Sequence, residues 1–497
     1  MSASHSLPSR SSCNCSAAFT ADRREARGGR HKTSSLKEEG HGTKNSDRGG
    51  AQTDSISDEM GEEKMAVDHV LFVHGYSVRQ LKGYGQFPTL LAAHKIPNSA
   101  IMLSAFLSLD DQVTCDDLAA ALEDHVAQFE AAGGALNRTG VICHSTGALV
   151  ARRWILNRVA AGRSLPSHLV SFAGANHGST LAQVGRTILA RLFRNVVEAS
   201  SVGAGVLADL DYGSSFLWTL NRQWLDTLNA GGLGNLRCFS LGGDRHDVFG
   251  DEVFWQVGER GSDSVVRVSG ANLKYTVIDA DPQANPPRLR AAAPLAPVAH
   301  LVVAGCTHGG IIGDVRAATD PPFAALLEAL AVDGEQAYQD VATNWANRTQ
   351  AWSAAHPDQV NAMVVFRLRD GAGRPIPDHL ILLQDSKGNA GAVSASLEPH
   401  QPIQNEAEPS SLAFYVNCAR FATTHPHIVH IEVRSDSPVI DYRDVDYAVA
   451  PSLPALVQPN EVTYVDVRVL RDVTRTYSVV LYDPARDVNA TWPPLPT

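Results

Sequence analysis

Residues 141–147 read Val-Ile-Cys-His-Ser-Thr-Gly, a short apolar run followed by a tight polar turn. We predict a buried strand over 139–144 that runs directly into a helix over 147–161. A serine at such a strand-to-helix turn is lifted above the sheet. The helix N-terminus beneath it offers backbone N–H groups to a developing oxyanion. The stretch therefore predicts a nucleophile elbow with Ser145 at its tip.

The alternation of strand and helix continues on both sides of this stretch. Short apolar runs predict further strands, and amphipathic runs predict helices between them. The predicted strands are 69–74, 100–108, 168–174, 236–242 and 299–305, and the predicted helices are 86–94, 116–131 and parts of 318–350. This order is typical of a largely parallel sheet with helices on both faces. We therefore predict an α/β catalytic domain over residues 65–350.

Residues 180–230 interrupt this alternation with helical sequence between two predicted sheet strands. Apolar residues recur at helix spacing over 188–197, with arginines between them. An insertion at this place in a hydrolase usually covers the active site. We predict a helical cap, and the alternative is an additional helix packed on the sheet.

Beyond residue 355 the hydrophobic period changes from that of helices to that of strands. Segments of alternating apolar and polar residues are separated by turn sequences such as Asp370-Gly371. The predicted strands are 361–369, 378–384, 411–417, 428–434, 461–469 and 476–482. This pattern predicts a separate antiparallel β-sandwich domain over residues 355–497.

Composition excludes several classes of function for this chain of 497 residues. A net charge of −11 argues against binding to nucleic acid and against binding to an anionic membrane by charge. No apolar run approaches the roughly 20 residues that a membrane span needs, so lipid contact is at most peripheral. The 7 cysteines are scattered as small buried residues are, which favours a reducing compartment.

The first 64 residues are poor in large apolar side chains and show no helical or strand period. We expect residues 1–64 to be a disordered tail. They contain no apolar segment of the kind found in secretory signals, so we expect a cytoplasmic protein. Nothing in the sequence indicates an oligomeric state.

An elbow serine needs a general base and an acid that orients this base. In α/β-hydrolases the chain order is serine, acid, histidine, each after the end of a strand. Asp263 lies in a polar loop before an apolar pair, and His308 follows the last predicted sheet strand. Asp244, directly after the strand at 236–242, is the competing acid. His177 is the competing base, but it comes too early in this order.

The strand at 69–74 ends in His74-Gly75, where glycine allows a tight turn. Such a turn directs the next backbone N–H into the site. The backbone N–H groups of Tyr76 and Thr146 are therefore the predicted oxyanion hole, and His74 itself is interpreted as structural. No cluster of histidine, cysteine or acidic residues has the spacing of metal ligands, which disfavours a zinc mechanism.

Taken together, four ordered motifs resemble the bacterial lipase and esterase branch of the α/β-hydrolase superfamily. The motifs are His74-Gly75, His-Ser-Thr-Gly followed by Ala-Leu-Val-Ala-Arg at 144–152, Asn-His-Gly-Ser at 176–179, and Ser-Asp-x-Val-Val at 262–266. The similarity covers residues 69 to about 315. It implies Ser145 as nucleophile, His308 as base and Asp263 as orienting acid. Members usually carry small residues or glycine where this chain has Cys143, Ala148 and Ser264.

These observations predict a serine carboxylester hydrolase that acts on a small-molecule or lipid ester and needs no cofactor. An acyltransferase or amidase would use the same triad, because the two reactions differ only in what reaches the acyl-enzyme. A third possibility is a non-catalytic binding or scaffold protein that works through the β-sandwich. The intact order of serine, acid and histidine argues against this last interpretation.

Overall fold

The computed structural model describes most of the chain from residue 65 to residue 473. The described residues are 65–73, 81–101, 112–179, 203–246, 260–281, 288–385, 387, 396–398, 401–424, 426–434, 440–442, 445–448 and 456–473. The predicted tail at 1–64, the cap helix at 188–197 and the strand at 476–482 lie outside these residues.

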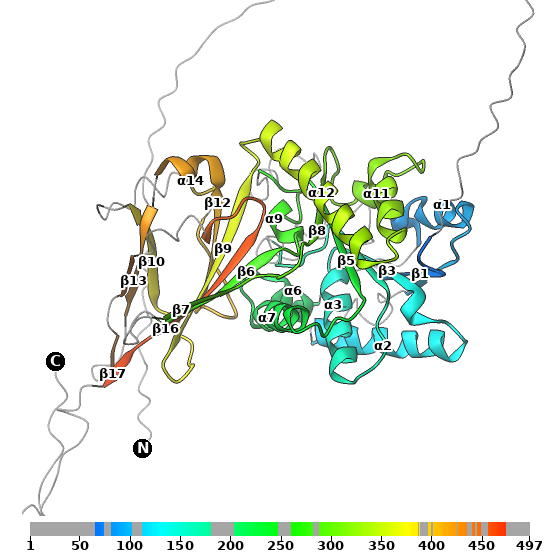
Figure 1. The fold of residues 1–497 in the computed structure, drawn as a ribbon. Coiled ribbons are helices and arrows are strands. Elements are labelled where there is room, and N and C mark those ends of the chain that lie inside the picture. Colours follow the sequence, from blue (N-terminus) through cyan, green and yellow to red (C-terminus); the bar gives the residue numbers. More distant parts are fainter. Residues whose placement is uncertain are drawn as a thin grey trace, which may run out of the picture. The chain divides into compact units, whose positions relative to one another are not determined.

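A six-stranded sheet, called here the first sheet, forms the centre of the predicted catalytic domain (Figure 1). Its order is β2-β1-β3-β4-β5-β8, and every pairing is parallel. The strands are β1 (His69–Val73), β2 (Asn98–Ile101), β3 (Thr139–His144), β4 (His168–Phe172), β5 (Arg237–Gly243) and β8 (Ala299–Val303). Each begins within two residues of a predicted strand, and the predicted α/β-hydrolase fold is confirmed.

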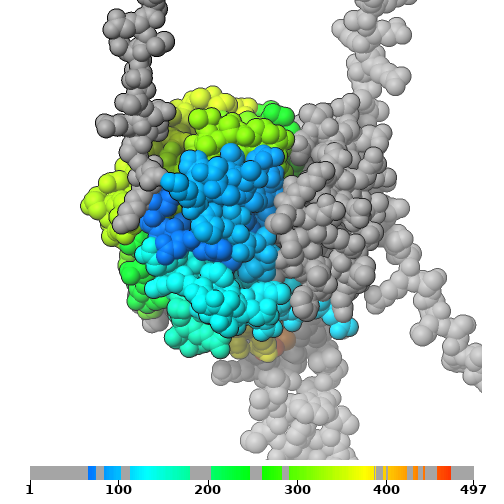
Figure 2. Space-filling view, turned by 90° about the vertical axis from the view of Figure 1, so that its right-hand side faces the viewer, coloured from blue at the N-terminus to red at the C-terminus, as the bar shows by residue number. Residues whose placement is uncertain are grey.

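Helices cover both faces of the first sheet. One face carries α1 (Phe87–Ala93), α11 (Pro321–Leu330) and α12 (Glu335–Ala355), whose rings Phe87, Phe323 and Trp345 join one buried cluster. Figure 2 shows segments from both faces, with the blue segment around α1 between the cyan α2 segment below it and the green segment above it. The other face carries α2 (Cys115–Ala131) and α3 (Gly147–Ala160).

Local sequence accounts for where these helices begin. Thr114 accepts from the backbone N–H of Asp117, and the Asp117 carboxylate accepts from the backbone N–H of Thr114, so α2 starts in a reciprocal capping box. Pro321 starts α11, where the N–H that proline lacks would have no partner within the helix.

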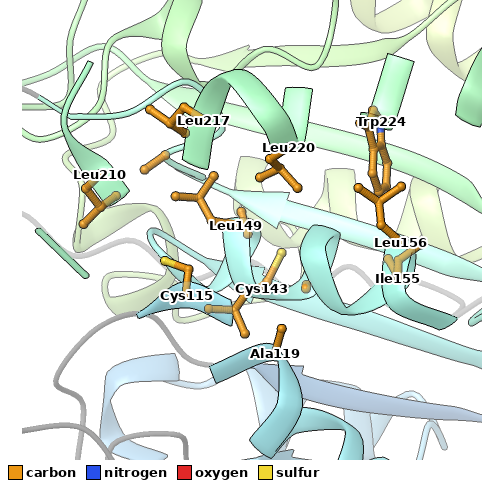
Figure 3. Packing of buried hydrophobic residues seen from close by; sticks show 14 of the residues in the cluster. Cys115, Ala119, Cys143, Leu149, Ile155, Leu156, Leu210, Leu217, Leu220 and Trp224 are labelled. Carbon is orange, nitrogen blue, oxygen red and sulfur yellow. The ribbon is translucent and has the colours of Figure 1, made fainter. Parts of the chain in front are cut away.

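The described part of the 180–230 insertion contains α6 (Ala204–Leu210) and α7 (Ser215–Asn229). The apolar stripe of α7, including Leu217, Leu220 and Trp224, packs with Leu149, Ile155 and Leu156 of α3 in one core (Figure 3). On its other side the Trp218 indole donates at 3.1 Å to Oγ of Ser411, the first residue of the strand β12 (Ser411–Asn417). These two helices are therefore packing elements, and the predicted cap at 188–197 stays a prediction.

The second sheet also has six strands, in the order β11-β12-β9-β16-β6-β7. They are β11 (Ile403–Gln404), β12 (Ser411–Asn417), β9 (Asn361–Asp370), β16 (Val462–Val469), β6 (Tyr275–Asp281) and β7 (Arg288–Ala292). It shares a hydrophobic core with a third sheet, β10 (His379–Asp385), β13 (Pro426–Val433) and β15 (Val445–Ala448). The shorter elements are 3₁₀ helices η1 (Leu81–Tyr84) and η3 (Leu136–Arg138), helices α9 (Val268–Ala271), α10 (Gly310–Gly313) and α14 (Cys418–Thr424), and the paired strands β14 (Ile440–Tyr442) and β17 (Arg471–Val473).

The second sheet differs from the predicted antiparallel one in two respects. First, β16 pairs in parallel with both β9 and β6, so the sheet is mixed. Second, β6 and β7 come from residues 275–292, inside the segment assigned to the catalytic domain. The predicted boundary at 350–355 stays a prediction, but strand pairing crosses it. Pairing between β6 and β16 joins residues almost 190 positions apart, which no local pattern can reveal.

Candidate active site

The strand and helix around Ser145 form the predicted sharp turn. All six residues of β3 are buried, and α3 begins two residues after Ser145. Ser145 itself has a φ of +55°, a left-handed conformation that is uncommon for residues other than glycine. Its N–H donates to the carbonyl of Phe172, and its own carbonyl accepts from Ala175. Strained backbone of this kind is concentrated at functional sites.

Cys143, where related proteins usually carry a smaller residue, fits within the core beneath the turn. Its Sγ lies 3.6 Å from the carbonyl of Val170, to which the thiol donates. Burial raises the pKa of Cys143 to about 12, so the thiol stays protonated and packs as a small apolar group.

Ser145, His308 and Asp263 meet in one chain of hydrogen bonds. His308 Nδ1 lies 3.0 Å from Asp263 Oδ2, and His308 Nε2 lies 3.0 Å from Ser145 Oγ. A carboxylate only accepts, so Nδ1 carries the ring hydrogen and Nε2 is left to accept from the serine hydroxyl. This is the arrangement in which histidine can take the proton from the serine hydroxyl.

The Asp263 carboxylate is held on both oxygens. Oδ1 accepts from the backbone N–H groups of Val265 at 3.0 Å and Val266 at 2.7 Å, while Oδ2 faces His308. The backbone N–H of His308 donates to the carbonyl of Asp263 at 3.2 Å. Asp263 is 1% exposed and His308 3% exposed, so water has little access to their hydrogen bond.

Asp244, the competing acid, is bound elsewhere. Its Oδ1 accepts from the backbone N–H of Gly305 at 2.6 Å, and its Oδ2 accepts from the Trp352 indole at 2.7 Å. The carboxylate therefore joins the turn after β8 to α12, and the geometry favours Asp263 as the partner of His308.

His177, the competing base, is buried between the two sheets. Its Nε2 donates to the carbonyl of Asn272 at 2.8 Å, and its Nδ1 accepts from the hydroxyl of Tyr464 on β16 at 3.0 Å. Burial and then the nearby Arg152 cation lower the pKa of His177 to about 3. These bonds make it a structural group that joins the catalytic domain to the second sheet.

Of the predicted oxyanion donors, only Thr146 is among the described residues. It is buried and precedes the first residue of α3, so its backbone N–H lies at a helix N-terminus beside Ser145. Tyr76 lies outside the described residues, as does His74. The oxyanion hole stays a prediction.

His144 contacts the loop that carries His308, a contact that the sequence did not indicate. Its Nε2 donates to the backbone carbonyl of His308 at 2.9 Å, and the two rings lie 4.7 Å apart. Because His144 directly precedes the elbow serine in sequence, its position could have indicated a place near the site. The bond fixes the backbone of the loop from which the His308 ring projects.

The turn at 260–266, called here the Asp263 turn, is attached to the second sheet. The amide of Asn361, at the start of β9, donates to the carbonyl of Arg260 at 2.9 Å. The hydroxyl of Tyr415, on β12, lies 3.0 and 3.1 Å from the carbonyl oxygens of Arg260 and Gly261. Nothing in the sequence around either residue indicates this role, because both contacts join segments more than 100 positions apart.

A buried arginine strengthens the same junction. Arg267, which directly follows the Asp263 turn, is fully buried, and its guanidinium lies 3.8 Å from the centre of the Tyr415 ring and 4.7 Å from that of Tyr212. Desolvated cation–π contacts of this kind are worth about 2 kcal/mol. The Asp263 turn is thus held by hydrogen bonds at its start and by stacking at its end.

Within the described part of the chain, no three histidine, cysteine or acidic side chains gather in a way that could hold a metal ion. In the same residues, no helix is both long and apolar enough to cross a membrane.

Comparison with known proteins places this geometry in context. No family model matches the chain, and no similar curated protein was found. Among solved structures, phospholipase PlaB from Legionella pneumophila is 25% identical, with a TM-score of 0.74 over 86% of this chain and 98% of that one. The same phospholipase in complex with thio-NAD gives a TM-score of 0.73. The Bacillus licheniformis lipase BlEst2, 18% identical, covers 53% of this chain with a TM-score of 0.35.

The chain resembles the bacterial lipase and esterase branch of the α/β-hydrolase superfamily, and the similarity to the phospholipase carries this resemblance. The resemblance expected from the four sequence motifs is therefore confirmed. The match to the phospholipase covers almost all of that protein. In this chain it spans more than the first sheet, which ends before residue 310. These similarities support a lipase- or esterase-like hydrolase.

Proposed function

We propose that the protein is a serine carboxylester hydrolase that forms an acyl-enzyme on Ser145. The observation that carries this proposal is the unbroken chain of hydrogen bonds from Asp263 through His308 to Ser145 Oγ, each 3.0 Å long. The left-handed backbone of Ser145 at the start of α3 adds to it. Left-handed backbone at a residue other than glycine costs about 1–3 kcal/mol, and such strain is concentrated at functional sites.

The reaction follows from these positions. His308 Nε2 takes the proton of the Ser145 hydroxyl as Oγ attacks the ester carbonyl. Asp263 keeps the ring hydrogen on Nδ1 and stabilises the imidazolium that forms. The tetrahedral oxyanion faces the N-terminus of α3, where the Thr146 N–H is one donor, and we assign the second donor to Tyr76. An oxyanion-hole donor is worth about 3–4 kcal/mol in the transition state.

The second half of the reaction uses the same groups. His308 returns its proton to the leaving alcohol oxygen, and the ester bond breaks to leave Ser145 acylated. Water then loses a proton to His308 and attacks the acyl carbonyl, which releases the acid and restores the serine. None of these steps requires a cofactor.

We assign lipid esters, and phospholipids among them, as the substrate class. This assignment is supported by the similarity to a solved phospholipase, which covers 86% of this chain and therefore extends beyond the first sheet. Short-chain esters that resemble only the reacting group would then be turned over more slowly than lipid esters.

The test combines active-site labelling with turnover. Wild type and Ser145→Ala are treated with a fluorophosphonate probe, and both are assayed on p-nitrophenyl esters from two to sixteen carbons and on phosphatidylcholine vesicles. We expect labelling and turnover in wild type, and a loss of at least about 10⁴-fold in Ser145→Ala.

The control variant is Ser215→Ala, which removes an exposed hydroxyl on α7 that donates to Glu408. It should label and turn over as wild type does. Labelling that persists in Ser145→Ala would refute the nucleophile assignment. Turnover of p-nitrophenyl esters without fatty-acid release from vesicles would refute the lipid assignment alone.

A further inference from the structure

The motif Asn-His-Gly-Ser at 176–179 ends in a buried serine that lies outside the proposed triad. Ser179 is 2% exposed, and its hydroxyl donates to the backbone carbonyl of Val265, in the Asp263 turn, at 2.5 Å. The two bonded residues are 86 positions apart in sequence. The bond therefore joins the loop after β4 to the turn that carries the proposed acid.

The carbonyl that accepts this bond belongs to a peptide group that also holds Asp263. The C=O of Val265 and the N–H of Val266 are the two polar ends of one planar peptide group, so they turn together. The N–H of Val266 donates to Asp263 Oδ1 at 2.7 Å, and the N–H of Val265 donates to the same oxygen at 3.0 Å. Ser179 Oγ and Asp263 Oδ1 are therefore bonded to opposite ends of one rigid unit.

A hydrogen bond at the carbonyl end of a peptide group has two effects at its N–H end. It restricts rotation of the peptide plane, and it polarises the group so that the N–H becomes a better donor. Oδ2 of Asp263 faces His308 Nδ1, so the direction of Oδ2 depends on how Oδ1 is held. The Ser179 hydroxyl can thus act on the orientation of the carboxylate without contact with His308 or Ser145.

The backbone of the motif fixes the place of the Ser179 hydroxyl. The N–H of Ser179 donates to the carbonyl of Leu210, the last residue of α6, at 2.9 Å, and the N–H of His177 donates to that of Gly270 in α9 at 3.2 Å. Gly178 lies between them with a φ of +99°, and a Cβ there would lie 2.7 Å from the carbonyl oxygen of Leu210. Glycine permits both this conformation and this close approach.

The same loop also contacts the turn at Ser145. The N–H of Ala175, four positions before Ser179, donates to the carbonyl of Ser145 at 3.2 Å. One short loop therefore bonds the backbone of the proposed nucleophile near its start and the turn of the proposed acid at its end. The second sheet bonds a different part of that turn, the carbonyl oxygens of Arg260 and Gly261.

We propose that Ser179 is a positioning residue that orients the Asp263 carboxylate through the peptide group between Val265 and Val266. Without its hydroxyl, Asp263 keeps its bond to His308 but is held less firmly in the direction that the imidazole requires. The proposal rests on the proposed function, because it needs Asp263 to act as the acid.

The first test measures kcat and KM on the best p-nitrophenyl ester, and the rate of fluorophosphonate labelling, in Ser179→Ala. We expect kcat and the labelling rate to fall about fivefold to tenfold while KM changes little. Ser240→Ala is the matched control, because it removes a fully buried hydroxyl on β5 that donates to the carbonyl of Ala299. It should lower the melting temperature to a similar extent and retain the wild-type kcat.

A double variant separates positioning from a general loss of stability. In Asp263→Asn the carboxylate that Ser179 orients is absent, so the addition of Ser179→Ala should not lower kcat further. A further fall of fivefold to tenfold in the double variant would overturn the proposal. So would a wild-type kcat in Ser179→Ala, or an equal fall in Ser240→Ala.

Failure of the proposed function gives a different result. Labelling that persists in Ser145→Ala would refute the proposed function, and the role of Ser179 with it. Labelling that is lost in Ser145→Ala, together with a wild-type kcat in Ser179→Ala, would refute the role of Ser179 alone.

Discussion

Ser145 and Asp263 both hydrogen-bond to the ring of His308, yet different parts of the molecule hold the two residues in place. The Ser145 turn bonds to Phe172, at the end of the strand β4 that pairs with β3, and to Ala175 in the loop that follows β4. The Asp263 turn bonds to Asn361 and Tyr415, on two strands of the second sheet. The proposed nucleophile is therefore positioned by local structure, and the proposed acid by contacts between residues distant in sequence.

This difference gives the second sheet a part in the site without any contact with Ser145. A substitution that disturbs the second sheet should change the position of Asp263 and the orientation of His308. It should leave the turn at Ser145 intact.

Asp263→Asn should lower kcat by about 10⁴-fold. The amide NH₂ group donates where the carboxylate oxygen accepts, so it favours the wrong tautomer of His308. That loss corresponds to about 5.5 kcal/mol of transition-state free energy. Asp244→Asn is the control, because its carboxylate bonds Gly305 and Trp352 instead of His308. The measurement is kcat on the best p-nitrophenyl ester. Equal losses in the two variants would show that the assignment of the acid is wrong.

The junction between the sheets should be sensitive to acid through His177. Its folded-state pKa of about 3 lies below its ordinary value of 6.5. The unfolded chain therefore binds a proton that the folded chain excludes. Stability is complete above pH 6.5 and is lost as the pH falls toward 3, by about 2–3 kcal/mol from this group near pH 4.5.

Urea unfolding at pH 7.5 and pH 4.5 measures this loss in wild type and in His177→Gln. Glutamine can still donate to the carbonyl of Asn272 but does not titrate, so its loss of stability should be smaller by about 2–3 kcal/mol. Losses of the same size in both proteins would place the acid-sensitive group elsewhere, for example at the buried His168, whose pKa burial lowers to about 4.

Tyr415→Phe should lower kcat by about tenfold while KM changes little, since the lost hydroxyl holds the Asp263 turn. Tyr338→Phe is matched to it. That hydroxyl donates to the carbonyl of Cys238, on β5 of the first sheet, and not to the Asp263 turn. We expect similar shifts in melting temperature for both variants and a fall in kcat for Tyr415→Phe alone. A comparable fall in both would mean that lost stability lowers kcat, with no specific role for the second sheet.

Much of the first sheet could be predicted from sequence because its signals are local. The strand predicted at 139–144 matches β3 at both ends, and the order of Ser145, Asp263 and His308 corresponds to three residues that meet in space. Asp244 remained a competing acid by sequence, because it directly follows a strand, while Asp263 lies in a polar loop before an apolar pair. The hydrogen bonds of the two carboxylates favour Asp263.

The second sheet shows where prediction from sequence fails. The alternating pattern located β9 and β12 but could not show that β6 joins them, since a parallel pairing has no adjoining turn to mark it. Arg152, a charged residue on α3, is fully buried, and it donates to Asn176 and Asn221 and stacks on Trp224. Burial of a paired arginine depends on partners that only the fold assembles.

The Ser145 turn and the Asp263 turn can be compared directly, because each contains a serine with a positive φ. A change at the second of these serines should have the smallest effect on stability. Ser145 has a φ of +55° and carries the hydroxyl that we propose as nucleophile, so its strain would be part of the site. Ser264, in the Asp263 turn, has a φ of +84° at a position where related lipases usually have glycine. Ser264→Gly should raise the free energy of unfolding by about 0.5 kcal/mol, because relief of backbone strain exceeds the entropy that glycine adds to the unfolded chain.

The reverse change at the neighbouring glycine is the control. Gly261 has a φ of +66°, and a Cβ there would lie 2.1 Å from the carbonyl oxygen of Gln359, so Gly261→Ser should be strongly destabilising. Urea unfolding measures both variants, and kcat should be retained in Ser264→Gly because Asp263 keeps its bonds to Val265 and Val266. If Ser264→Gly instead lowered kcat, the serine side chain would have to act in the site. Strain would then serve catalysis in both turns.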